Sequence, residues 1–131
     1  MKINNNKFAG TNTSFFTSGP SRIALLAIRN IGIDVEVRQV NLWKKEQLDA
    51  DFVKINPQHC VPTIDHDGFV LWESRAIATY LADVKYPNGT ALYPKDIQKR
   101  AVVNQRLQFD AGVLYPRIRS ICVSHKRHSC S

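Results

Sequence analysis

Several features that assign proteins to a class at once are missing from this sequence. The three cysteines, Cys60, Cys122 and Cys130, include no Cys-x-x-Cys pair, so they predict neither a disulfide framework nor a zinc site. The three cysteines are better explained as reduced thiols of a cytosolic protein. No apolar run approaches the ~20 residues needed to cross a bilayer, and the first residues lack the apolar segment of a secretory signal. We therefore expect a soluble, cytoplasmic protein without a metal and without a membrane partner.

The composition is that of a globular protein. Of its 131 residues, 44% are hydrophobic and 9% aromatic, which argues against disorder and suits one domain, or one domain with part of another. The formal net charge is +7, but the basic residues are spread along the chain and are densest at 125–128. Solvated surface or an unfolded tail explains such charge more often than nucleic acid does. We expect no nucleic-acid partner.

Local patterns predict an α/β domain over residues 14–86, preceded by a disordered leader at 1–13. Gly19 and Pro20 suit the start of a helix, Gly32 suits its end, and a crossover helix between two strands places them parallel. The expected elements are a strand at 14–17, a helix at 20–31, a strand at 34–42, a short irregular helix at 43–54, strands at 63–65 and 69–72, and a helix from 74. The predicted order is thus β-α-β-α-β-β-α.

The remainder of the chain reads as the start of a separate all-α domain. Two prolines and a glycine at 87–94 indicate a linker. Residues 95–131 are expected to form a partial all-α domain with an irregular tail, in which one long helical pattern runs from Lys95 to about Tyr115. Pro116 is expected to kink or end this helix, and the pattern collapses from Cys122 onward.

Six short segments, taken in order, resemble the insect delta and epsilon classes of glutathione S-transferase. They are SGPSR (18–22), NPQHCVPT (56–63), WESRAI (72–77), LYPK (92–95), NQRL (104–107) and FD (109–110). The resemblance implies a thioredoxin-like N-terminal domain that binds glutathione as co-substrate, followed by the first helix of an all-α C-terminal domain that is otherwise truncated. It also implies conjugation of glutathione to a small hydrophobic electrophile, in detoxification, and a possible homodimer.

Ser18 corresponds, through this resemblance, to the catalytic serine that donates its hydroxyl to the glutathione sulfur. A thiol has a pKa of about 8.5, so its thiolate must be stabilised at neutral pH. The alternative is an N-cap that serves only the following helix. Because Ser18 and Ser21 stand where redox relatives of this fold carry cysteines, disulfide exchange by that route is excluded.

The resemblance assigns further residues to the binding of glutathione. Val61-Pro62 resembles a cis-proline step that exposes the Val61 backbone to a bound peptide, although a trans proline at a strand edge is the ordinary alternative. His59 is expected to meet the glycine carboxylate, unless it is simply a surface residue. Gln47 stands where many relatives carry a histidine that contacts the same end. Cys60 is expected to pack, with a mixed disulfide to glutathione as a lesser alternative.

Through the same resemblance, three residues at the start of the helix from residue 74 are expected to hold the γ-glutamyl end of glutathione. Ser74 and the helix N-terminus suit its carboxylate, Glu73 its ammonium group, and Arg75 adds positive charge. A capped helix with a solvated Glu–Arg pair is the alternative.

In the second domain, Phe109 and Tyr115 are candidates for an electrophile pocket, or else part of a helix stripe that packs on its neighbours. Two other functions stay open. One is a truncated glutathione-binding variant with little or no turnover, and the other is a non-enzymatic interaction module.

Overall fold

The computed structural model describes residues 10–14 and 18–128, with side chains described from 18 to 122. The chain divides into two compact units after Gly89, within the segment predicted as a linker. Each unit is described separately below.

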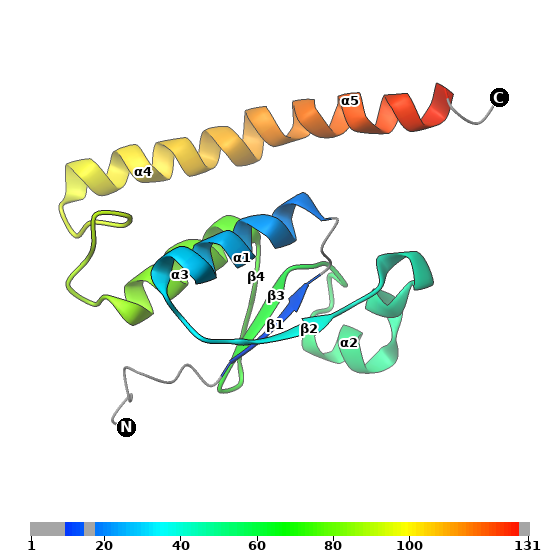
Figure 1. Ribbon diagram of the computed structural model, residues 1–131, viewed down its shortest axis with the longest axis horizontal. Helices are drawn as coiled ribbons and strands as arrows, with labels where there is room; N and C mark the ends of the chain where they lie inside the picture. Colours follow the sequence, from blue (N-terminus) through cyan, green and yellow to red (C-terminus); the bar gives the residue numbers. More distant parts are fainter. Residues whose placement is uncertain (1–9, 15–17, 129–131) are drawn as a thin grey trace. The chain divides into compact units, whose positions relative to one another are not determined.

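The first unit has the predicted order of strands and helices. Its elements are β1 (Gly10–Ser14), α1 (Gly19–Ile31), β2 (Glu36–Gln39), α2 (Ala50–Ile55), β3 (Thr63–His66), β4 (Phe69–Trp72) and α3 (Ser74–Lys85), with two 3₁₀ turns, η1 (Leu42–Lys44) and η2 (Glu46–Leu48), before α2 (Figure 1). The prediction of a β-α-β-α-β-β-α domain is therefore confirmed.

The position of the first strand was predicted wrongly. We expected it at 14–17, where aromatic residues favour a strand, and assigned residues 1–13 to a leader; β1 instead occupies Gly10–Ser14. Residues 15–17 lie outside the described residues. The reason is that β1 pairs on both sides, with β2 and with β3, and pairing of this kind overrides local strand propensity.

The four strands form one mixed sheet in the order β2-β1-β3-β4. β1 runs parallel to β2, as the crossover through α1 requires, and antiparallel to β3, which forms a hairpin with β4. The hairpin turn has positive φ at both central residues, Asp67 (53°) and Gly68 (87°), which is the conformation that suits the twist of the flanking strands.

The core lies where α1 and α3 pack together over one face of the sheet (Figure 1). Ala24, Ile77 and Leu81 are completely buried and Ile64 of β3 is 1% exposed, because the apolar positions of each helix recur on a single face. α1 is not buried all round, since Leu26 remains 57% exposed.

α1 begins and ends at the predicted signals. Pro20 lies in its first turn, and Gly32 adopts φ 72° as a left-handed cap whose N–H donates to the Ile28 and Arg29 carbonyls at 3.0 and 3.2 Å.

The second unit is one helical run with a π turn inside it. α4 (Ile97–Phe109) passes through η3 (Asp110–Leu114), a π turn, into α5 (Tyr115–His128). The helix therefore does not end at Pro116, and the expected loss of helix from Cys122 is wrong for the backbone as far as His128. The Tyr115 N–H donates to the Asp110 carbonyl five residues back, so the widened turn takes up the interruption that a proline makes in the hydrogen-bond ladder.

The segment before α4 is fixed to that helix by Arg100. Its guanidinium lies 4.0 Å from the centre of the Tyr93 ring, and its Nε donates a 2.6 Å hydrogen bond to the Pro94 carbonyl.

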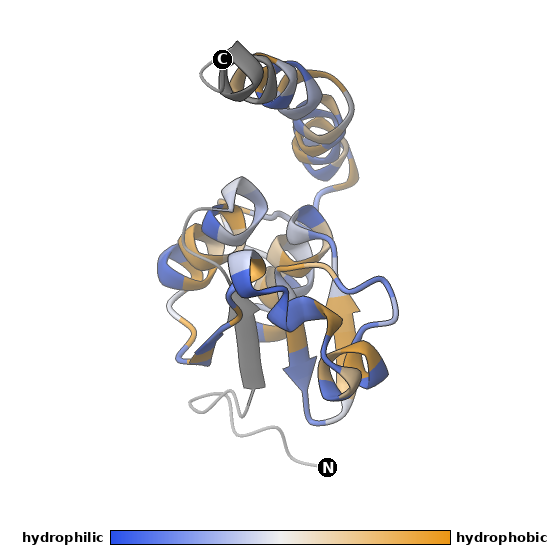
Figure 2. Cartoon of the chain, turned by 90° about the vertical axis from the view of Figure 1, so that its right-hand side faces the viewer, coloured by the Kyte–Doolittle hydropathy of each residue, from blue (hydrophilic) through white to orange (hydrophobic). Residues whose placement is uncertain are grey.

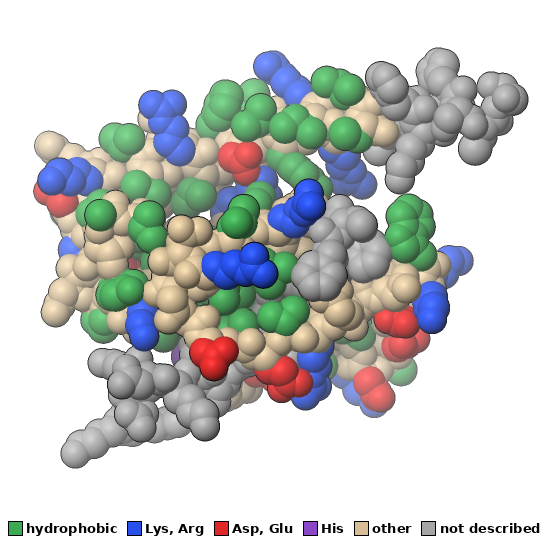
Figure 3. All heavy atoms as spheres, in the orientation of Figure 1, with side chains coloured by type: hydrophobic (Ala, Val, Ile, Leu, Met, Phe, Trp, Pro, Cys, Tyr) green, Lys and Arg blue, Asp and Glu red, His purple; other side chains and the backbone are tan. Residues whose placement is uncertain are grey.

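Apolar side chains are exposed along this helical run. Ile97 is 84% exposed, and Phe109, Ile118 and Ile121 are 51%, 48% and 60% exposed. Hydrophobic and hydrophilic residues are mixed around the helix (Figure 2), and hydrophobic side chains lie open along it (Figure 3). Among the described residues, no helix combines the length and the apolar character needed to cross a membrane.

Candidate functional site

The strand register gathers three predicted site segments at one end of the sheet. Thr63, the first residue of β3, pairs with Thr13 of β1 on one side and with Trp72, the last residue of β4, on the other. The residues just before Thr63 and just after Trp72 therefore lie at the same edge, where β1 also ends. Val61, Glu73 and Ser74 are brought together in this way, and Ser18 follows the end of β1.

The N-terminus of α3 provides donors for an anion. Ser74 is 1% exposed, and its Oγ accepts a 3.0 Å hydrogen bond from Nη1 of Arg75. The first N–H groups of a helix have no partners within it, and the helix dipole adds positive potential there. A carboxylate is thus the group that this end of α3 suits best.

Glu73 precedes α3 in an unusual backbone conformation. Its φ is 74° and its ψ is 107°, its side chain makes no capping hydrogen bond, and it is exposed. A non-glycine residue with positive φ costs of the order of 1–3 kcal/mol and is typical of functional sites. The conformation leaves a carboxylate free beside the helix N-terminus, where it can pair with a cation. Sequence patterns gave no sign of this backbone geometry.

The loop between α2 and β3 carries His59, Val61 and Pro62. The Val61–Pro62 peptide bond is cis, so that prediction is confirmed. His59 is exposed and has a φ of 43°. Among the described residues, no hydrogen bond is made by the Val61 backbone N–H or C=O, so both are available to a ligand.

Asn56 organises this loop, a role that sequence reasoning missed. It is completely buried, its Oδ1 accepts from the Gln58 N–H at 2.9 Å, and its Nδ2 donates to Thr63 Oγ1 at 2.9 Å. A buried polar side chain needs several partners, and nothing in the local sequence shows which ones Asn56 has.

Ser18 is the N-cap of α1. Its Oγ accepts a hydrogen bond from the Ser21 N–H at 3.4 Å, so the capping role that sequence analysis left open is present. The catalytic role is compatible with it, because a hydroxyl accepts through its lone pairs and still has its own proton to donate.

Gln47 lies in η2 with an unpaired acceptor. Its Oε1 is buried and has no hydrogen-bond partner among the residues that the structure describes. Buried acceptors are usually paired, so Gln47 is a polar group that a ligand could satisfy.

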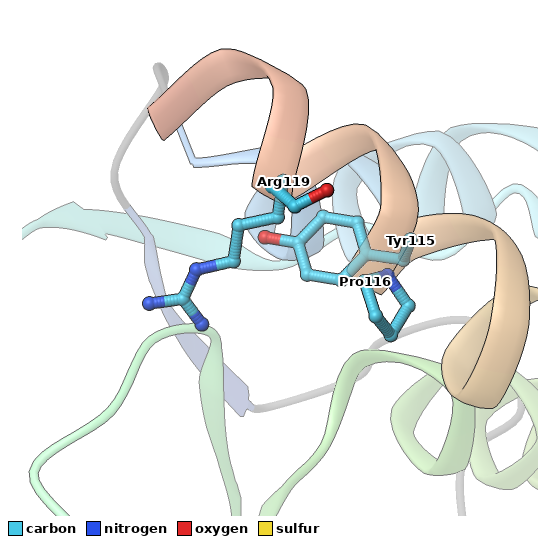
Figure 4. Close-up of a pocket in the computed structure, with 4 residues that line it drawn as sticks. Tyr115, Pro116 and Arg119 are labelled. Carbon is cyan, nitrogen blue, oxygen red and sulfur yellow. The ribbon is translucent and has the colours of Figure 1, made fainter. Parts of the chain in front are cut away.

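The two electrophile candidates lie in the second unit. Phe109 ends α4 and is 51% exposed. Tyr115 begins α5 and lines a hollow with Pro116, Arg119 and Ser120, in which the Tyr115 ring lies beside the Arg119 side chain one turn further on (Figure 4).

A second polar cluster lies at the opposite end of the β3–β4 hairpin. His66 Nδ1 and the Tyr80 hydroxyl are joined by a 2.7 Å hydrogen bond. Burial of the Tyr80 ring, with the Asp67 carboxylate adding to the effect, raises the pKa of the Tyr80 hydroxyl. Within the described chain, no three His, Cys, Asp or Glu side chains are grouped so as to hold a metal ion.

Comparison with known proteins gives a consistent family. The model described as "Glutathione S-transferase, N-terminal domain" matches residues 15–83. The chain is 50% identical over 101 residues to glutathione S-transferase D7 of Anopheles gambiae, an alignment that covers 77% of this chain and 46% of the relative.

Solved structures agree in fold as well as in sequence. The unclassified glutathione S-transferase 2 of Bombyx mori matches with a TM-score of 0.80 and 62% identity, covering 88% of this chain and 53% of that one. A delta-class glutathione transferase of Nilaparvata lugens matches with a TM-score of 0.84 and 44% identity, covering 93% of this chain and 57% of that one. An epsilon-class glutathione S-transferase of Musca domestica matches with a TM-score of 0.81 and 40% identity, covering 92% of this chain and 55% of that one. The chain thus spans about half the length of the relatives it matches.

Proposed function

The chain belongs to the glutathione S-transferase family, and we propose that it binds glutathione in its first unit and transfers the glutathione thiolate to small hydrophobic electrophiles. One observation carries this proposal. A hydroxyl donor, an unpaired backbone segment and a helix N-terminus with a buried serine all lie at one end of the sheet.

The peptide would be held along this edge by groups that match its chemistry. The γ-glutamyl carboxylate suits Ser74 and the α3 N-terminus, with Arg75 adding charge, and the γ-glutamyl ammonium suits the free carboxylate of Glu73. Val61 would pair with the cysteinyl backbone as an added strand does.

The glycine carboxylate would lie toward His59 and Gln47. The His59 ring supplies a hydrogen-bond donor. The Gln47 amide supplies a donor, and its buried acceptor would gain a partner from the peptide.

Ser18 would stabilise the thiolate. Each unit by which the thiol pKa is lowered requires about 1.4 kcal/mol of preference for the charged form. The Ser18 proton and the α1 N-terminus can both supply it, because Ser18 uses a lone pair and not its proton to cap the helix. Holding both reactants together supplies the rest of the catalysis.

The electrophile would contact Phe109 and Tyr115. A second candidate function, glutathione binding with little turnover, is favoured by the 51% exposure of Phe109, because an electrophile on an open helix face remains in water. We also propose that the protein is cytoplasmic and forms a homodimer. Sedimentation at several protein concentrations tests whether it dimerises.

The test combines calorimetry with glutathione and an assay of conjugation to a chloronitrobenzene. Ser18→Ala should still bind glutathione, with kcat/KM about 100-fold lower and weaker thiolate absorbance of the bound peptide. Asp96→Ala is the matched control, because Asp96 caps α4 through the Lys99 N–H at 2.9 Å and its loss removes a cap without touching the proposed site.

Each outcome separates the candidates. Conjugation that is unchanged in Ser18→Ala would refute the role of Ser18. Binding without turnover by the unaltered chain would favour the second candidate. No binding at millimolar glutathione would leave the non-enzymatic interaction module.

A further inference from the structure

We propose that Asn56 and Thr63 act together as positioning residues that aim the Val61 backbone N–H at bound glutathione. The inference rests on the proposed function and adds to it two residues that contact no substrate. Both side chains are buried, Asn56 completely and Thr63 with 1% exposure.

The two side chains converge on one backbone carbonyl. Thr63 Oγ1 donates a 2.8 Å hydrogen bond to the Cys60 C=O, and Asn56 Nδ2 donates to the same carbonyl at 3.2 Å. Asn56 Nδ2 also donates to Thr63 Oγ1 at 2.9 Å, so the three groups form a closed triangle. The Cys60 carbonyl is thereby held toward the buried side of the loop.

That carbonyl belongs to the same peptide unit as the Val61 N–H. A trans peptide is planar, and its N–H points opposite to its C=O. Fixing the Cys60 carbonyl toward Asn56 and Thr63 therefore turns the Val61 N–H away from them, and that N–H makes no hydrogen bond among the described residues. Two donors on the carbonyl also polarise the unit, which makes the N–H a better donor.

A purely structural role for the triangle predicts something different. Loss of one hydrogen bond would then lower the stability of the loop and leave the Val61 N–H no less able to bind the peptide. The distinguishing readout is therefore the behaviour of this one amide, together with glutathione affinity measured on folded protein.

The experiment compares three threonine variants of the full chain. Thr63→Val keeps the shape and removes the hydroxyl, whereas Thr63→Ser restores it. Thr79→Val is the matched control, because Thr79 Oγ1 also donates to backbone carbonyls, those of Arg75 and Ala76 at 3.3 and 3.0 Å, but within α3. Glutathione Kd is measured by calorimetry, and Val61 amide hydrogen exchange by NMR with and without glutathione.

We expect Thr63→Val to weaken glutathione binding about five- to tenfold, which is the size of one hydrogen bond. Glutathione should slow exchange of the Val61 amide in the unaltered chain and in Thr63→Ser, and less so in Thr63→Val. Thr79→Val should match the unaltered chain in both measurements.

Equal affinity and equal Val61 protection in folded Thr63→Val would overturn the inference while the proposed function stands. If Thr63→Val does not fold, the unaltered chain still decides, because a Val61 amide that glutathione leaves unprotected contradicts the inference directly. Failure of the unaltered chain to bind glutathione would instead overturn the proposed function, and this inference with it.

Discussion

The Tyr86 hydroxyl donates a 3.0 Å hydrogen bond to the backbone carbonyl of Ile31. Ile31 is the last residue of α1 and Tyr86 follows the last residue of α3. The last carbonyls of a helix lack partners within it, so a side chain from a distant part of the sequence satisfies one of them and ties the ends of the two packed helices together.

Removal of this hydroxyl should destabilise the first unit. Tyr86→Phe keeps the ring and loses one partly buried hydrogen bond, so we expect the free energy of unfolding to fall by about 1 kcal/mol. Urea denaturation followed by circular dichroism measures it. Tyr93→Phe is the control, since its hydroxyl bond to Asn104 is exposed and should matter less. Equal effects of the two substitutions would contradict the tie between α1 and α3.

Two substitutions at Glu73 distinguish the contribution of its carboxylate to glutathione binding from the cost of its positive φ in stability. Both Glu73→Ala and Glu73→Gly remove the carboxylate, so both should weaken glutathione binding alike. Only glycine adopts a φ of 74° without strain, so the glycine variant should be more stable than the alanine variant by about 1 kcal/mol. Thermal denaturation and calorimetry on the same samples test this; an alanine variant as stable as the glycine one would mean that the strain is absent.

Two glycines with equally open surroundings should respond oppositely to alanine. A Cβ on either Gly32 or Gly112 would meet nothing within 4 Å, but only Gly32 has positive φ, at 72°. Gly32→Ala should therefore lower the free energy of unfolding by about 1 kcal/mol through its left-handed cap. Gly112→Ala, within the helical run, should be neutral or raise it by up to about 1 kcal/mol. Denaturant melts of both variants measure the signs, and a loss at Gly112 as large as that at Gly32 would rule out φ as the cause.

Tyr80 should make stability depend on alkaline pH. Burial and then the Asp67 carboxylate raise the pKa of its hydroxyl above the ordinary value of 10.0. A group with a raised folded pKa contributes stability that is complete below the unfolded value and is lost as pH rises through the folded one. The free energy of unfolding should therefore fall as pH rises above about 10, more steeply in the unaltered chain than in Tyr80→Phe. Parallel slopes would show that Tyr80 does not contribute.

Much of the architecture followed from local chemistry. The ends of α1 and the start of α3 at Ser74 were predicted, because glycine, proline and capping residues act on their own backbone. The cis step at Val61–Pro62 was predicted from the family resemblance. The expected glutathione-binding residues came from the family resemblance and remain proposals.

The two errors have different causes. The first strand is at Gly10–Ser14, because β2 and β3, which are distant in the sequence, pair with it there. The helix continues past Pro116, because a local π turn precedes the proline, and the residue pattern did not indicate that turn.

The same division applies to the site. The local sequence indicated a helix N-terminus at Ser74, and the family resemblance implied a hydroxyl donor at Ser18 and a peptide edge at Val61. The strand register brought them to one end of the sheet through pairing between segments far apart in the chain, which only the folded structure supplies. Asn56, Cys60 and Thr63 are close in the sequence, but only the folded structure shows that both side chains donate to one carbonyl and that Glu73 has positive φ.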